Sequence, residues 1–156
     1  MTAGMGQDPD QDSDGFRYAQ AVVEEALRLY PPAWSIVRDA ITDDEIDGHP
    51  IPVGSVVITS PYVTHRDPQL WPMPQAFCPE RFLADSPDRP EYAYFPFGAG
   101  MRHCVGNRMA LRQASTVIAA LASRFALVAT SSAPATPVPA VTLRPSHAIM
   151  LRLSLR

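Results

Sequence analysis

The distribution of proline limits where this chain can form long regular elements. Seventeen of its 156 residues are proline, about twice the usual share of ~5%. Because proline fixes φ and lacks a backbone donor, long helices are confined to the stretches without it. Residues 15–30 and 105–125 are such stretches, and their apolar residues recur with helical spacing. We therefore predict two main helices.

The rest of the chain is expected to form short strands and one long irregular segment. Between residues 35 and 60 the sequence predicts short strands, with turns at Asp47-Gly48 and Val53-Gly54. Residues 61–96 contain a proline every few positions, and a segment this long without a regular element indicates a functional or specially packed loop. Alternation near residues 141–145 and 148–155 predicts a final hairpin. The fold class is therefore α+β.

The two predicted helices have recognisable ends and apolar faces. Asp14 is a candidate N-cap of the first helix, and Pro31-Pro32 ends it, because the residue before a proline disfavours helical geometry. The apolar face of the first helix comprises Ala19, Val22, Val23, Ala26, Leu27 and Tyr30. The apolar face of the second comprises Ala110, Ala114, Val117, Ile118, Leu121 and Phe125.

Composition and charge exclude several classes of function. The formal charge of −3 offers no basic field for nucleic acid. All 13 basic residues are arginine, which reflects a GC-rich genome and not chemistry. No stretch is long and apolar enough to predict a membrane span, and the N-terminus lacks a secretion signal. With two cysteines, one chemically used thiol in a cytoplasmic protein fits better than a disulfide.

The densest chemical signal is the segment of residues 97–106, FGAGMRHCVG. Two glycines permit a tight turn that places Cys104 at the start of the second helix. The unpaired N–H groups and the positive dipole end of that helix favour a thiolate over a thiol. Such a thiolate serves as a nucleophile, a redox thiol or a soft metal ligand. A cysteine in an arbitrary position is more often a buried structural residue.

The spacing Phe-x-x-Gly-x-Arg-x-Cys-x-Gly resembles the haem-binding signature of the cytochrome P450 superfamily. The residues that carry the resemblance are Phe97, Gly100, Arg102, Cys104 and Gly106. It implies haem b (iron protoporphyrin IX) as cofactor, with Cys104 as the axial thiolate ligand of the iron. By the same resemblance Arg102 pairs with a haem propionate, Gly106 lets the helix backbone approach the porphyrin, and Phe97 packs beside the sulfur.

Glu25 and Arg28 form a Glu-x-x-Arg pair on the first helix. Periodicity alone favours a solvated pair opposite the apolar face, worth at most about 1 kcal/mol. The resemblance implies a different role, because in the family such a pair is completed by an arginine from a Pro-Glu-Arg-Phe segment. That segment is residues 79–82 here, so Arg81 is expected to join Glu25 and Arg28 in a partly buried network that anchors the irregular loop.

Several other residues receive expected roles. The resemblance makes Arg38 a second propionate contact, with an ordinary surface arginine as the alternative. Residues 65–68, His-Arg-Asp-Pro, resemble a family segment that we interpret as structural. His103 is expected to point away from the iron, and Cys78 to be a packed or incidental thiol. Arg108 and Arg112 lie on the polar face of the second helix, either as a solvated face or as a docking site for a negatively charged electron donor.

The resemblance implies the C-terminal part of the mainly α cytochrome P450 fold, with two main helices, small β-sheets and a long irregular loop before the haem-binding cysteine loop. We expect a disordered leader over residues 1–14 and a truncated haem-binding domain over residues 15–156. The long distal helix with its glycine and threonine for oxygen activation is missing from the sequence, so no catalytic residue is assigned beyond the haem ligand.

Three functions remain open from the sequence. The first is the haem-binding part of a monooxygenase that inserts oxygen from dioxygen into a small organic substrate, with electrons from a donor such as ferredoxin and its reductase. The second is a non-catalytic haem-binding fragment or inactive remnant. The third is a thiol-based redox protein that uses Cys104 and Cys78.

Overall fold

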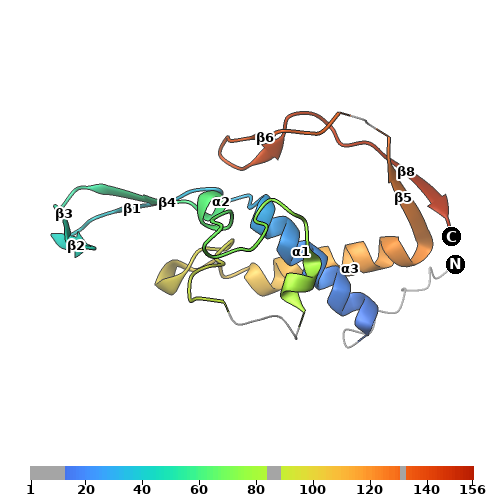
Figure 1. The fold of residues 1–156 in the computed structure, drawn as a ribbon, viewed down its shortest axis with the longest axis horizontal. Helices are drawn as coiled ribbons and strands as arrows, with labels where there is room; N and C mark the ends of the chain where they lie inside the picture. Colours follow the sequence, from blue (N-terminus) through green and yellow to red (C-terminus); the bar gives the residue numbers. More distant parts are fainter. Residues whose placement is uncertain (1–12, 84–88, 131–132) are drawn as a thin grey trace, which may run out of the picture.

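The computed structural model describes residues 13–83, 89–130 and 133–156. Two long helices, α1 (Asp14–Leu29) and α3 (Asn107–Arg124), cross each other at the centre of the molecule (Figure 1). Short strands extend from this centre at both ends of the molecule. The α+β class is therefore confirmed. Residues 1–12 of the expected leader lie outside the described residues, whereas Ser13 and Asp14 form the start of α1.

Both helices lie close to where the proline-free stretches predict them. The N-cap of α1 is Ser13 and not Asp14, because the Ser13 hydroxyl accepts a hydrogen bond from the Phe16 N–H at 3.3 Å. Asp14 instead occupies the first helical turn, where its negative charge complements the helix dipole. The N-cap of α3 is Gly106, which supplies no side-chain cap.

Helix α1 is buried on more sides than its apolar face predicts. It contacts α3, the short helix α2 (Pro61–Thr64) and the 3-10 helix η1 (Pro79–Phe82). Ala19 and Val23 of the predicted face are buried, whereas Tyr30 is 53% exposed. The other buried residues of α1 are Phe16, Ala21, Glu25, Arg28 and Leu29.

Helix α3 meets α1 through small side chains, so its predicted apolar face is only partly correct. Ser115 is fully buried, and Ala114 and Ile118 are half-buried. Val117 and Leu121 are exposed. Because the two helices cross, small residues at the crossing allow close approach, and Ile118 lines a cavity with Phe16 and Ala19 of α1.

Within the described ranges the strands form four two-stranded antiparallel sheets. Strand β1 (Ile36–Asp39) pairs with β4 (Val56–Thr59), and β2 (Asp44–Ile46) pairs with β3 (His49–Ile51). The predicted turn at Asp47-Gly48 joins β2 to β3, and both of its residues have positive φ, as a two-residue hairpin turn requires.

The predicted final hairpin between residues 141–145 and 148–155 is wrong. Strand β8 (Leu151–Leu155) pairs with β5 (Phe125–Ala129), and β7 (Arg144–Pro145) pairs with β6 (Pro137–Val138). Alternation indicates that a segment is a strand, but it carries no information about a partner more than twenty residues away. The hairpin of β6 and β7 is held against the segment after α1 by a hydrogen bond from the Leu143 N–H to the Pro32 carbonyl.

Residues 61–96 have no long element among those described, as the proline spacing predicts. Their regular structure consists of α2 and η1, and the rest is turns. This segment wraps over α1 in Figure 1. Within the residues that the structure describes, no helix is long and apolar enough to cross a membrane.

Candidate functional site

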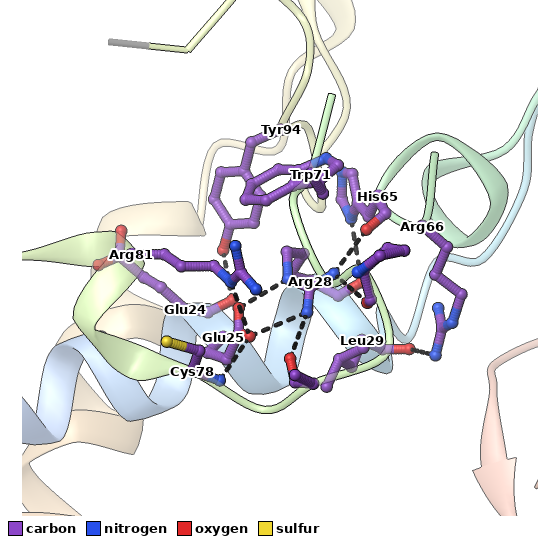
Figure 2. A network of polar contacts seen from close by, with 12 residues as sticks. Glu24, Glu25, Arg28, Leu29, His65, Arg66, Trp71, Cys78, Arg81 and Tyr94 are labelled. Atoms are coloured by element: carbon purple, nitrogen blue, oxygen red, sulfur yellow. Dashed lines mark hydrogen bonds and ion pairs between the residues drawn. The ribbon is translucent and has the colours of Figure 1, made fainter. Parts of the chain in front are cut away.

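A buried ion pair between Glu25 and Arg28 lies at the centre of the polar site shown in Figure 2. The Arg28 Nε donates to one carboxylate oxygen of Glu25 at 2.7 Å, and a terminal nitrogen donates to the other at 2.9 Å. Both side chains are 0% exposed. The solvated pair that periodicity favoured is therefore wrong, because the irregular loop covers this side of α1.

Arg28 uses all of its N–H donors. Besides the two hydrogen bonds to Glu25, it donates to the carbonyls of His65, Pro74 and Ala76 at 2.7, 2.8 and 3.0 Å. A guanidinium has five N–H groups in a fixed planar arrangement, and here each has an acceptor. One side chain thus fixes three backbone positions of a loop that has almost no regular structure.

Glu25 receives further donors from the next residues of the same loop. The Cys78 N–H donates to a Glu25 carboxylate oxygen at 2.8 Å. The Arg81 Nε lies 3.6 Å from that oxygen, with the Arg81 side chain 12% exposed. The structure therefore brings Glu25, Arg28 and Arg81 together, and we call these three residues the anchor network. Two arginines facing one carboxylate offset the cost of burying its charge.

Aromatic side chains enclose the anchor network on one side. Trp71 is 1% exposed, and the Arg28 guanidinium carbon lies 5.1 Å from the centre of its ring. The Tyr94 ring packs against both Trp71 and Phe82, and its hydroxyl donates to the Glu24 carbonyl at 3.0 Å. Burial raises the pKa of Tyr94. Sequence reasoning missed this cluster; its signal was the concentration of aromatic residues within a proline-rich segment.

His65 is fully buried beside the anchor network. Its Nε2 accepts a hydrogen bond from the Phe95 N–H at 2.9 Å, and its Nδ1 lies 3.3 Å from the Arg28 carbonyl oxygen. Burial lowers the pKa of His65 to about 4, so the imidazole is neutral at pH 7. The neighbouring Arg66 donates to the carbonyls of Leu29 and Tyr62, which agrees with a structural role for this segment.

The cysteine loop, residues 97–106, leads from these aromatic residues into α3. Gly98 and Gly100 have φ of +77° and +66°, a region that side chains rarely adopt. The Cys104 N–H donates to the Phe97 carbonyl at 3.0 Å, which closes the loop. Cys104 is an exposed free cysteine, flanked by the fully exposed Met101 and Val105.

The structure places Arg38 and the cysteine loop at one pocket of about 280 Å³. The pocket is lined by Ile36, Arg38, Thr59, Tyr92, Phe95 and Ala99. Arg38 and Arg102 are both exposed. Phe97 and Gly106 are half-buried, and a Cβ added to Gly106 would lie 3.9 Å from the Cys104 sulfur.

The remaining residues singled out from the sequence lie on the surface. Arg108, Arg112 and His103 are exposed. Cys78 is half-buried, and its thiol donates to the Glu80 carboxylate at 3.3 Å. This hydrogen bond raises the pKa of the Cys78 thiol, which disfavours the thiolate that a redox role requires.

The model of the family "Cytochrome P450" matches residues 4–152. The chain belongs to the cytochrome P450 family. It is 39% identical over 129 residues to a cyclooctatin synthase of Streptomyces melanosporofaciens. This match covers 82% of this chain and 26% of the relative. It is 37% identical over 134 residues to a cyclooctat-9-en-7-ol 5-monooxygenase of the same organism, covering 85% of this chain and 28% of the relative.

A solved P450 structure has the same fold as this chain. The retinoic acid-bound cyanobacterial CYP120A1 matches with a TM-score of 0.81 and 32% identity, covering 89% of this chain and 32% of that chain. The structure is thus a partial P450 fold. The chain spans about a quarter to a third of the length of these relatives.

The residues of the cysteine loop fit the haem iron that the P450 family implies. Among the described residues, no group of three or more His, Cys, Asp or Glu could hold a metal ion. A porphyrin supplies the other donors of its iron, so one cysteine is enough as the protein ligand. The Cys104 sulfur is exposed, and the arginines Arg38 and Arg102 are exposed as well. A thiolate binds a metal, and arginines pair with carboxylates, so these residues suit an anionic prosthetic group that holds a metal.

Proposed function

We propose that this chain is the haem-binding part of a haem-thiolate monooxygenase. The observation that carries the proposal is Cys104, exposed after a glycine turn and two residues before the N-cap of α3, at the entry to that helix. Its backbone N–H is held by the Phe97 carbonyl, and among the described residues the exposed thiol has no disulfide partner, which leaves the sulfur open to a ligand. When bound, haem b would supply the oxygen-activating chemistry of the family.

The chain's own residues would hold and orient that group. Cys104 would bind the iron through its thiolate, and Arg102 and Arg38 would pair with the propionates. Phe97, half-buried at the start of the loop, would shield the sulfur from water. Gly100 permits the left-handed turn, and Gly106 keeps the start of α3 free of a side chain beside the sulfur.

The reaction we propose inserts one oxygen atom from dioxygen into a small organic substrate. The name of one relative, a 5-monooxygenase, supports this reaction class. The electrons would come from a redox partner such as ferredoxin and its reductase. Arg108 and Arg112, exposed at the start of α3, would help a negatively charged donor to dock on the cysteine side.

Haem reconstitution tests the proposal. We expect the chain to take up haem and to show the Soret band of a thiolate ligand when reduced and bound to CO. Cys104→Ala should lose that band, whereas the matched control Cys78→Ala should keep it, because Cys78 lies outside the cysteine loop and contacts Glu25 and Glu80. Failure of the wild-type chain to show a thiolate band would refute the proposal.

A second candidate is a haem-binding fragment without turnover. The exposure of Met101, Cys104 and Val105 favours it, because no described part of the chain covers this face of the cysteine loop. Product formation with an electron donor system separates the two candidates.

Reversing the charges of Arg108 and Arg112 tests their role in docking the electron donor. The reversal should slow haem reduction at unchanged haem content; an unchanged rate would remove the docking role.

A further inference from the structure

His65 lies between the anchor network and the start of the cysteine loop. It exchanges two contacts with Arg28: the His65 carbonyl accepts from the Arg28 guanidinium at 2.7 Å, and the His65 Nδ1 faces the Arg28 carbonyl oxygen at 3.3 Å. On the other edge of the ring, Nε2 accepts from the Phe95 N–H at 2.9 Å. Figure 2 shows the ring beside Arg28 and Trp71.

The contacts determine which ring nitrogen carries the proton. A backbone N–H can only donate, so Nε2 must be the unprotonated acceptor. The neutral ring then carries its proton on Nδ1, directed at the Arg28 carbonyl. The charged groups that face the ring are Arg28 from α1 and Arg66 after α2, and Tyr94 packs against it from the segment before the loop. Both cations disfavour a second proton on the ring.

Phe95 lies two residues before the cysteine loop. Its carbonyl accepts from the Gly98 N–H at 3.0 Å, which forms the first turn, and the Phe97 carbonyl then accepts from the Cys104 N–H at 3.0 Å. The far end of the loop is fixed because it continues into α3, which packs on α1. At the near end, two side chains bind the backbone: Trp71 Nε1 donates to the Ala93 carbonyl at 3.2 Å, and His65 Nε2 accepts from the Phe95 N–H at 2.9 Å, the contact nearer to the loop.

We propose that His65 is a positioning residue that fixes the entry to the cysteine loop relative to α1, through one hydrogen bond from the Phe95 N–H to Nε2. The inference deepens the proposed function and rests on it, because the position of Cys104 follows from the position of the loop. His65 does not touch the cofactor site; it acts through Phe95 and the turn at Gly98. The loop requires the acceptor nitrogen Nε2 of His65. It does not require the volume of the ring or the Nδ1–H donor.

Three substitutions in the full chain separate these properties. In His65→Gln the side-chain oxygen reaches the position of Nε2 and keeps the acceptor for Phe95. In His65→Asn the shorter amide reaches only the position of Nδ1 and keeps the contact to Arg28. His65→Leu removes both contacts. Val23→Ala, at a buried position of α1 outside this contact chain, controls for lost stability.

Two readouts are measured for each variant: amide hydrogen exchange of the chain without haem, and the reduced, CO-bound Soret band after haem is added. We expect exchange at Phe95 and Cys104 to be faster by on the order of tenfold in His65→Asn and His65→Leu. His65→Gln and Val23→Ala should keep wild-type protection at both amides. The thiolate band should likewise be lost in His65→Asn and His65→Leu and retained in His65→Gln and Val23→Ala.

The proposal is overturned if His65→Asn protects Phe95 and Cys104 as well as His65→Gln does. It is also overturned if loss of protection follows global stability, with Val23→Ala behaving like His65→Leu. Amide exchange is measured without haem, so it tests the role of His65 even when the wild-type chain shows no thiolate band. A missing thiolate band in the wild-type chain would refute the proposed function alone.

Discussion

Replacing Arg28 with lysine tests whether the irregular loop depends on the geometry of one guanidinium. The substitution keeps the positive charge but reduces five donors in a planar arrangement to three at a single nitrogen. Arg28 serves two carboxylate oxygens of Glu25 and three backbone carbonyls, so at least two acceptors lose their donor. The expected loss follows from this count.

The magnitude comes from the cost of an unsatisfied buried group. Each acceptor left without a donor costs about 1–3 kcal/mol, and breaking a buried ion pair costs about 3–5 kcal/mol. Glu25 retains the Cys78 N–H and Arg81, which limits the loss. We therefore expect Arg28→Lys to lower the free energy of unfolding by about 3–5 kcal/mol.

Urea unfolding followed by tryptophan fluorescence measures this change. Trp71 is buried against Arg28 and reports on the site directly, and a Trp34→Phe background removes the other tryptophan signal. Arg17→Lys is the matched control, because Arg17 lies exposed on the same helix. It should change stability by less than about 0.5 kcal/mol. If Arg28→Lys unfolds at the same urea concentration as Arg17→Lys, the guanidinium geometry is not what holds the loop.

Three further predictions concern stability. The pKa of His65 is lowered to about 4 in the folded chain, so the unfolded chain binds more protons between pH 4 and 6.5. Stability should therefore fall by up to about 3 kcal/mol as pH falls through this range; an equal pH dependence in His65→Gln would contradict the assignment. Ser13→Ala removes the cap on the Phe16 N–H and should cost about 1 kcal/mol in urea unfolding; no loss would mean that the cap contributes nothing. Gly98→Ala, at a φ of +77°, should cost about 1–2 kcal/mol, whereas Gly15→Ala in α1, with open space around it, should not destabilise; equal effects would remove the strain argument.

Local rules in the sequence predicted the two long helices and several of the strands, but not the strands β5 and β6 and not the strand partners. The proline-free stretches gave the two helices to within two residues at their ends, and the positive-φ turn at Asp47-Gly48 gave the hairpin of β2 and β3. These features depend on backbone geometry within a few residues. The pairing of β5 with β8 depends on contacts across more than twenty residues, so alternation alone misassigned it.

The sequence by itself determined which residues we propose for the chemistry, because the spacing around Cys104 and the Glu25–Arg28 pair can be read along the chain. Only the tertiary structure decided their environment. Helical periodicity placed Glu25 and Arg28 on a solvated face, yet both are fully buried, because a loop more than forty residues away in sequence folds over them. Burial depends on what the rest of the chain places against a helix face, and that determines whether a pair of charges is solvated or holds a loop in position.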